Sequence, residues 1–189
     1  MSKALGLLSG GLDSSLAALC LKRQGVDVTA ICFVTPFFGS GKAELAAKQM
    51  DIPLIIENIS EVHLAMVKKP RYGYGKNLNP CIDCHAMMFR IAGEIMAERG
   101  FDFLFSGEVL GQRPMSQNSE ALRSVANYSG QPDRILRPMS AKILPISRTF
   151  SSETLKSMST ISAVSPSTAR MVFSTRTVRA ARLASDGGA

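Results

Sequence analysis

The chain has 189 residues, of which 46% are hydrophobic and 20% are charged. These proportions are close to globular averages, so they exclude a chain that is disordered throughout and a collagen-like or fibrous protein. The 22 basic and 15 acidic side chains give a net charge of +7, which favours an anionic partner without identifying it. No apolar run approaches the roughly 20 residues that a membrane span needs, and four cysteines are too few for a disulfide scaffold. We therefore expect a reduced, cytoplasmic protein without a membrane segment.

Short apolar runs alternate with stretches of helical period over the first 145 residues. In chain order, the pattern predicts a strand at Lys3–Leu8, a helix at Asp13–Gln24, a strand at Asp27–Phe33, a helix at Lys42–Met50, a strand at Leu54–Glu57, a helix at Glu61–Lys69 capped by Ser60, a helix at Ile82–Arg99, a strand at Phe101–Phe105, a helix at Ser116–Tyr128 and a strand at Arg134–Arg137. Such alternation is typical of parallel strands joined by crossover helices. We expect an α/β fold with an open parallel sheet of about five strands flanked by helices.

The composition changes after Pro145. Residues 146–189 hold ten serines, six threonines and six basic residues, against only Glu153 and Asp186 as acidic residues. This segment has no convincing apolar face, and it carries more than half of the excess positive charge. We expect a folded domain at residues 1–145 and an irregular, poorly ordered basic tail at residues 146–189.

A glycine- and serine-rich turn, Leu7–Ser15 (LLSGGLDSS), joins the first strand to the first helix. Gly10 and Gly11 allow a tight turn that points successive N–H groups into one concavity, and the helix N-terminus adds unpaired N–H groups and a positive dipole end. The hydroxyl groups of Ser9, Ser14 and Ser15 surround the same place. The pattern predicts a phosphate cradle at the carboxyl end of a strand, where open α/β sheets bind ligands. Asp13 either caps the helix or holds a Mg²⁺ ion that neutralises the phosphates.

Cys81 and Cys84 form a CxxC motif after Pro80, at or near a helix start, with His85 next in the chain. The helix dipole lowers thiol pKa values at such a place, which favours thiolates that carry sulfur, form a disulfide or bind metal. A structural zinc site usually needs four protein ligands, and an Fe–S cluster also needs more than two cysteines. Sulfur or redox chemistry is the favoured interpretation, while an Fe–S or zinc site and two incidental thiols remain alternatives.

Upstream of this motif, residues Val67–Lys76 (VKKPRYGYGK) mix four basic residues with Tyr72 and Tyr74. Basic and aromatic side chains in one loop suit phosphate contact combined with base stacking, as RNA binding requires. A run of this kind is more often a solvated face, so both interpretations remain open.

Four strings together carry a family resemblance. Ser9–Ser14 resembles the PP-loop signature SGG(hydrophobic)DS of the adenine-nucleotide α-hydrolase superfamily, which cleaves ATP between the α and β phosphates. Phe105–Gln117 (FSGEVLGQRPMSQ) looks like the TGE-x-LGQ-x-x-SQ segment of tRNA 4-thiouridine synthases, and Asn79–His85 (NPCIDCH) looks like the NPD-x-x-CN segment of tRNA 2-thiouridylases. Ile135–Ala141 (ILRPMSA) resembles the last conserved strand of these domains. The resemblance spans about residues 3–145 and implies a Rossmann-like, HUP-type ATP-binding catalytic domain.

The resemblance also implies a function and its site. It implies ATP-dependent thiolation of a tRNA uridine, in which the uridine carbonyl is adenylated, pyrophosphate is released and sulfur is then transferred. Cys84 matches the first catalytic cysteine of the 2-thiouridylases and would carry the sulfur, with Cys81 as its resolving or co-ligand partner and Asp13 as the Mg²⁺ ligand. The implied cofactors are ATP and Mg²⁺, with a possible Fe–S cluster on the two cysteines, and the implied partners are tRNA and a sulfur donor, either a persulfide protein or sulfide. The candidate nucleotide-binding residues are Ser9, Gly10, Gly11, Leu12, Asp13, Ser14, Ser15, Phe33, Ser106, Gly107, Gln112 and Ser116.

The chain also departs from these families. No cysteine follows Cys84, whereas the second catalytic cysteine of the 2-thiouridylases comes well after the first. We also expect no N-terminal RNA-binding extension of the kind that 4-thiouridine synthases carry. Residues after Pro145 match neither family, and an altered reading frame or a truncation is one hypothesis for this. Two other functions therefore stay open: an amidoligase-type ATP pyrophosphatase that acts on a small carboxylate, and an inactive nucleotide-binding remnant.

Overall fold

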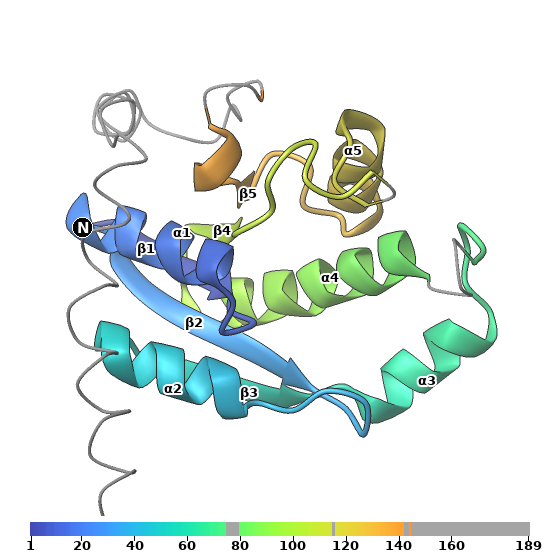
Figure 1. Cartoon of the computed structure of the whole chain (residues 1–189), viewed down its shortest axis with the longest axis horizontal. Coiled ribbons are helices and arrows are strands. Elements are labelled where there is room, and N and C mark those ends of the chain that lie inside the picture. The colour runs from blue at the N-terminus through green and yellow to red at the C-terminus, as the bar shows by residue number, and fades with distance from the viewer. Residues whose placement is uncertain (75–79, 115, 142–143, 145–189) are drawn as a thin grey trace, which may run out of the picture. The chain divides into compact units, whose positions relative to one another are not determined.

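A computed structural model describes residues 1–74, 80–114, 116–141 and 144 of the chain. These residues contain a five-stranded sheet in the order β3-β2-β1-β4-β5, in which every neighbouring pair is parallel (Figure 1). The open parallel sheet predicted from the sequence is confirmed. The strands are β1 (Lys3–Leu7), β2 (Asp27–Val34), β3 (Leu54–Asn58), β4 (Phe103–Ser106) and β5 (Ile135–Leu136).

The helices also follow the predicted order, with bounds that differ by up to three residues. The largest shift is at the start of the fifth helix, which was expected at Ser116 and begins at Ser119, because the side chain of Asn118 caps it by accepting a hydrogen bond from the Ala121 N–H at 2.8 Å. Ser60 is not the cap of the third helix but its first residue, and its hydroxyl donates to Asn58 Oδ1 at 2.6 Å. The helices are α1 (Leu12–Arg23), α2 (Gly41–Met50), α3 (Ser60–Lys68), α4 (Cys81–Arg99), α5 (Ser119–Tyr128) and the short 3₁₀ helix η2 (Pro138–Ser140).

The strand order reverses direction at β1, and this reversal positions the site. The chain moves outward from β1 through β2 to β3, then returns to place β4 on the other side of β1. Because crossovers between parallel strands are right-handed, the two directions put their helices on opposite faces of the sheet. Accordingly α1 packs against α2, while α4 packs against α3 and α5 (Figure 1). A crevice at the carboxyl ends of β1 and β4 follows from this topology.

The apolar core lies between the central strands and α4. Leu5 of β1, Ile31 of β2 and Leu104 of β4 are fully buried, and Phe89 and Met96 of α4 cover them. Within the described residues, no helix combines the length and the apolar character that crossing a bilayer requires. The predicted tail and the domain boundary at residue 145 lie outside the described residues, so that division of the chain stays a prediction.

Candidate functional site

A cavity of about 400 Å³ opens at the carboxyl ends of β1, β2 and β4, where the topology predicts a ligand site. Its wall combines the turn after β1, the end of β2, one side of α4 and the segment after β4. Eight of the twelve candidate nucleotide-binding residues line it: Ser9, Gly11, Asp13, Ser14, Phe33, Ser106, Gly107 and Gln112. The other four, Gly10, Leu12, Ser15 and Ser116, are outside its lining.

The glycine-rich turn after β1 adopts a conformation that depends on its glycines. Gly10 has a φ of 76°, and a Cβ there would overlap the backbone of Lys42 in α2. The hydroxyls of Ser14 and Ser15 donate to the carbonyl oxygen of Gly11 at 3.0 and 2.9 Å. Both hydroxyl protons are therefore used in hydrogen bonds within the protein and are not donated to a ligand in this arrangement. The first N–H groups of α1, which have no partner within the helix, are the donors left for an anion.

Asp13 does not cap α1, which corrects one of the two roles considered for it. The N-cap residue is Gly11, and no side chain caps the helix. The Asp13 carboxylate lines the cavity and accepts a hydrogen bond from Gln112 Nε2 at 3.2 Å. This position agrees with the role of Mg²⁺ ligand, because Mg²⁺ is commonly bound by one or two carboxylates together with the phosphates of the substrate.

Gly107, after β4, allows the Phe105–Gln117 segment to pack against the glycine-rich turn after β1. A Cβ on Gly107 would overlap the backbone C of Asp13 and the backbone N of Ser14, so only glycine permits this approach. The contact lies at the start of α1, and the Gln112–Asp13 hydrogen bond joins the same two segments. Two of the four strings that carry the resemblance, Ser9–Ser14 and Phe105–Gln117, are distant in the sequence and thus form one wall of one cavity.

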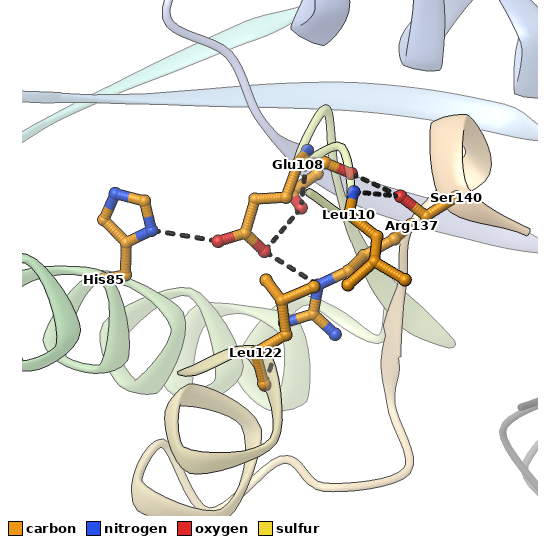
Figure 2. Close-up of polar contacts among 7 residues, drawn as sticks. His85, Glu108, Leu110, Leu122, Arg137 and Ser140 are labelled. Atoms are coloured by element: carbon orange, nitrogen blue, oxygen red, sulfur yellow. Dashed lines mark hydrogen bonds and ion pairs between the residues drawn. The ribbon is translucent and has the colours of Figure 1, made fainter. Parts of the chain in front are cut away.

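Glu108, which also lines the cavity, is the centre of a buried polar network (Figure 2). Its Oε1 atom lies 2.9 Å from Nδ1 of His85, and its Oε2 atom accepts from Nε of Arg137 at 2.8 Å and from the hydroxyl of Ser106 at 3.1 Å. Burial alone would raise the pKa of Glu108, but the hydrogen bond from His85 and the charge of Arg137 outweigh it and lower that pKa to about 2. Glu108 is therefore a carboxylate at all ordinary pH values.

The network also fixes the backbone around the site. The hydroxyl of Ser140 donates to the Glu108 carbonyl oxygen at 3.1 Å and accepts from the Leu110 N–H at 2.8 Å. Nη2 of Arg137 donates to the carbonyl oxygen of Leu122 in α5 at 3.3 Å. Sequence reasoning missed Glu108, Arg137 and Ser140 as site residues, although the strings SGE and ILRPMSA contain them. Neither string indicated that the side chains of Arg137 and Ser140 would contact Glu108.

Gln117 is a further residue that sequence reasoning missed. It is 6% exposed and lines the cavity, and its Oε1 atom is buried without a hydrogen-bond partner among the described residues. A buried amide oxygen without a partner costs free energy. Its place in the SQ pair of the quoted segment is the only sequence signal that pointed to it.

The two cysteines of the CxxC motif begin α4 beside the cavity wall but are not among the residues that line it. Burial is the main cause that raises the pKa of the Cys84 thiol to about 11, and the neighbouring Cys81 and Asp83 raise it further. The expected lowering of the pKa is thus wrong for Cys84, because burial favours the neutral thiol. His85, the next residue, does line the cavity.

The metal alternatives for the CxxC motif do not fit the residues around it. All four cysteines of the chain are free and lie within the described residues, with Cys20 on α1 and Cys32 in β2. Among the described residues, no three His, Cys, Asp or Glu side chains are grouped so as to hold a metal ion. Two thiols fall short of the ligand set of a structural zinc site or an Fe–S cluster.

The fold and this site are those of the PP-loop ATP pyrophosphatase superfamily. A parallel sheet carries the anion-binding turn SGGLDSS after β1, where the strand order reverses, and the segment that contains Gly107 and Glu108 packs onto this turn. A family model described as "ThiI: Thiamine biosynthesis protein (ThiI)" matches residues 1–143. The chain belongs to this family.

Relatives of the chain include enzymes named for tRNA thiolation. A probable tRNA sulfurtransferase of Staphylococcus aureus (strain MRSA252) is 30% identical over 145 residues, which cover 72% of this chain and 34% of the relative. The tRNA-specific 2-thiouridylase MnmA of Desulfosudis oleivorans is 41% identical over 86 residues, which cover 42% of this chain and 24% of the relative. The chain therefore spans about a third or less of the length of these relatives.

Solved structures agree with this placement. The crystal structure of a 4-thiouridine synthetase–RNA complex with bound ATP superposes with a TM-score of 0.59 at 28% identity, covering 85% of this chain and 40% of that chain. A predicted subunit of tRNA methyltransferase from Methanocaldococcus jannaschii superposes with a TM-score of 0.54 at 18% identity, covering 85% of this chain and 75% of that one, and supports the fold alone.

Proposed function

We propose that this protein catalyses the ATP-dependent thiolation of a tRNA uridine, with ATP bound in the cavity at the ends of β1 and β4. The observation that carries the proposal is the packing of Gly107 onto Asp13 and Ser14, which unites the two nucleotide motifs around one cavity. The family membership, the named tRNA sulfurtransferase relatives and the ATP and RNA in the 4-thiouridine synthetase structure support it. The four free cysteines suit a reducing compartment such as the cytoplasm.

In this proposal the start of α1 binds the phosphates of ATP. Backbone N–H groups and the helix dipole stabilise the negative charge that develops on the phosphates during the reaction. Asp13 would hold a Mg²⁺ ion against those phosphates, and that ion would neutralise their charge when bound. Gln112 orients the Asp13 carboxylate through the hydrogen bond at 3.2 Å.

The reaction would proceed in two stages. A uridine carbonyl oxygen attacks the α phosphorus of ATP, and pyrophosphate leaves. The carbonyl oxygen, a poor leaving group by itself, is now adenylated and can leave as part of AMP. A sulfur nucleophile then attacks the activated ring carbon, AMP leaves, and the carbon–oxygen bond is replaced by a carbon–sulfur bond.

Cys84 is the proposed sulfur carrier, loaded as a persulfide by a persulfide-bearing protein. In this persulfide Sγ is already bonded to the outer sulfur, so the atom that attacks the ring carbon is the terminal sulfur and not Sγ. The resulting disulfide joins Sγ of Cys84 to the sulfur on the ring carbon. The Cys81 sulfur attacks Sγ of Cys84, which breaks this S–S bond, releases the thiouridine and leaves a Cys81–Cys84 disulfide. An external thiol then supplies two electrons and restores both cysteines. No step passes through a metal cluster.

A reconstitution of the full chain with ATP, Mg²⁺, unmodified tRNA, a persulfide protein and a thiol reductant tests the proposal. We expect pyrophosphate release that depends on tRNA, and thiouridine detectable by nucleoside mass spectrometry. Asp13→Asn should abolish both, whereas Cys84→Ser should keep pyrophosphate release and lose thiouridine. Asp27→Asn, an exposed aspartate at the opposite end of β2, serves as the matched control.

Two results would contradict this function. Pyrophosphate release that responds to a small carboxylate and not to tRNA indicates an amidoligase-type enzyme. Absence of ATP turnover with every substrate, in a protein that still binds ATP, indicates an inactive nucleotide-binding remnant.

A further inference from the structure

Two of the three tyrosines in the chain meet at one surface site. Tyr72 follows α3 and Tyr128 ends α5, yet their ring centroids are 5.7 Å apart in an edge-to-face arrangement. The guanidinium carbon of Arg71 lies 4.8 Å from the centre of the Tyr128 ring, in a cation–π contact. All three side chains remain exposed, with Tyr72 at 48% and Tyr128 at 37%. We call Arg71, Tyr72 and Tyr128 the aromatic platform.

A buried carboxylate attaches the aromatic platform to α4. Asp83 is 1% exposed, and its two oxygens accept the backbone N–H groups of Arg71 at 2.9 Å and of Tyr72 at 3.0 Å. A buried carboxylate needs such partners, so the contact is a fixed one. Because Asp83 lies between Cys81 and Cys84 in the first turn of α4, the platform is held by the turn that carries both proposed sulfur-transfer residues.

The platform also adjoins the cavity through that same turn. His85, two residues after Asp83, lines the cavity and lies 2.9 Å from Glu108. Tyr74 ties the segment that follows α3 to the end of that helix, since its hydroxyl donates to the carbonyl oxygen of Val67 at 2.6 Å. Asp83, Cys84 and His85 are consecutive in α4. The residue that anchors the platform, the proposed sulfur carrier and a residue of the cavity wall therefore follow one another along one helical turn.

The charge and the ring geometry of the platform select its occupant. Aromatic rings and guanidinium planes both stack on nucleobases, whatever the base, because every base has a π face. Lys68 and Lys69 are exposed beside Arg71, and no acidic residue occurs between Val62 and Tyr74. An RNA strand would place its phosphates against this positive charge and its bases against the rings, so one ligand uses both features of the site.

We propose that the aromatic platform stacks an unpaired nucleobase of the substrate RNA and so holds the strand beside the cysteines of α4. This inference rests on the proposed function, because it takes RNA as the substrate. The structure adds what the loop sequence left open: Tyr128 contributes from α5, and Asp83 gives the loop a fixed position.

The tyrosines themselves provide the probe. The chain has three tyrosines and no tryptophan, so Tyr72, Tyr74 and Tyr128 give all of its tyrosine fluorescence, and no indole masks it. The full chain is titrated with a single-stranded oligoribonucleotide in low salt, and fluorescence and affinity are measured together. We expect stacking to quench the emission, and Tyr128→Leu and Tyr72→Leu each to weaken RNA binding about tenfold.

Matched variants separate stacking from folding and from general charge. Tyr128→Phe keeps the ring and should retain the affinity that Tyr128→Leu loses. Arg71→Gln should weaken binding more than Arg99→Gln, which removes an exposed cation from the far end of α4. Phe37→Leu, at a 76% exposed aromatic residue outside the platform, should have no effect.

The outcomes distinguish this inference from the function on which it rests. Unchanged fluorescence at saturating RNA, or unchanged affinity in both leucine variants, overturns the platform even if ATP-dependent thiolation is observed. Quenching and ring-dependent affinity support the platform, and they stand even if tRNA-dependent pyrophosphate release is absent, in which case it is the proposed function that fails.

Discussion

Nε of Arg137 donates a hydrogen bond to Oε2 of Glu108 at 2.8 Å, although the two residues are 29 positions apart in the chain. Both side chains are less than 10% exposed. The pair connects the end of β5 to the turn that packs on the PP-loop, and His85 and Ser106 share the same carboxylate (Figure 2). A buried ion pair of this kind positions the wall of the candidate site, and several measurable consequences follow.

Removing the cation should strongly destabilise the fold. In Arg137→Met the Glu108 carboxylate stays buried without its main charged partner, which typically costs about 3–5 kcal/mol. Urea unfolding should show a lower midpoint with an unchanged slope. Arg99→Met, at the exposed end of α4, should change the free energy of unfolding by no more than about 0.5 kcal/mol. Equal effects of the two substitutions would contradict the assignment of Arg137 to a buried pair.

Stability should depend on pH through Glu108. Its pKa is lowered in the folded state to about 2 from an ordinary value of 4.5, so the folded protein keeps the carboxylate charged where the unfolded chain protonates it. The stabilisation is complete above about pH 4.5 and is lost as the pH falls toward 2. We expect the difference in unfolding free energy between the wild type and Glu108→Gln to shrink over that interval. A difference that stays constant from pH 7 to pH 3 would argue against the lowered pKa.

Gly107→Ala should separate nucleotide binding from general stability. Its Cβ would overlap the backbone at Asp13 and Ser14, so the turn after β4 must move away from the PP-loop. ATP affinity, measured by calorimetry, should fall at least about tenfold because the binding N–H groups lose their arrangement. Gly41→Ala is the control, since a Cβ at that position in α2 meets no atom within 4 Å. Wild-type ATP affinity in Gly107→Ala would show that the close approach is not required.

The Cys84 thiol should react slowly with alkylating reagents at neutral pH. Only the thiolate is the nucleophile, and burial raises the pKa of Cys84 to about 11. The rate of iodoacetamide labelling at Cys84, followed by peptide mass spectrometry, should still be rising at pH 10. Labelling in urea provides the comparison, because the unfolded chain restores the ordinary pKa. A labelling rate that levels off below pH 8 in the folded protein would show a lowered pKa instead.

The order of elements could be predicted because the signals for strands and helices are local. The alternation of apolar runs with helical period located all five strands and all five main helices, with errors only at their ends. The largest of these errors has a local physical cause, because the side chain of Asn118 caps α5 and the helix therefore begins at Ser119. The turn at Gly10 was recognisable for the same reason, since its chemistry lies in consecutive residues.

Two predictions about site residues failed because the state of a side chain depends on the fold around it. The helix N-terminus indicated a lowered pKa for Cys84, and the fold raises it by removing the thiol from water. A helix cap was one of the two roles considered for Asp13, yet Asp13 lies in the cavity wall and accepts its hydrogen bond from Gln112. Asp13 accepts its hydrogen bond from a residue 99 positions away, and the burial of Cys84 is a property of the whole fold.

By itself, the sequence determined the parallel α/β fold, the position of the anion-binding turn and the superfamily of the chain, because these depend on periodicity and on short contiguous motifs. Only the tertiary structure decided that Glu108 joins His85 to Arg137 and that Tyr72 meets Tyr128. Such pairs form when crossovers bring distant segments together at the edge of the sheet, and the strength of each contact depends on the water that the whole fold excludes.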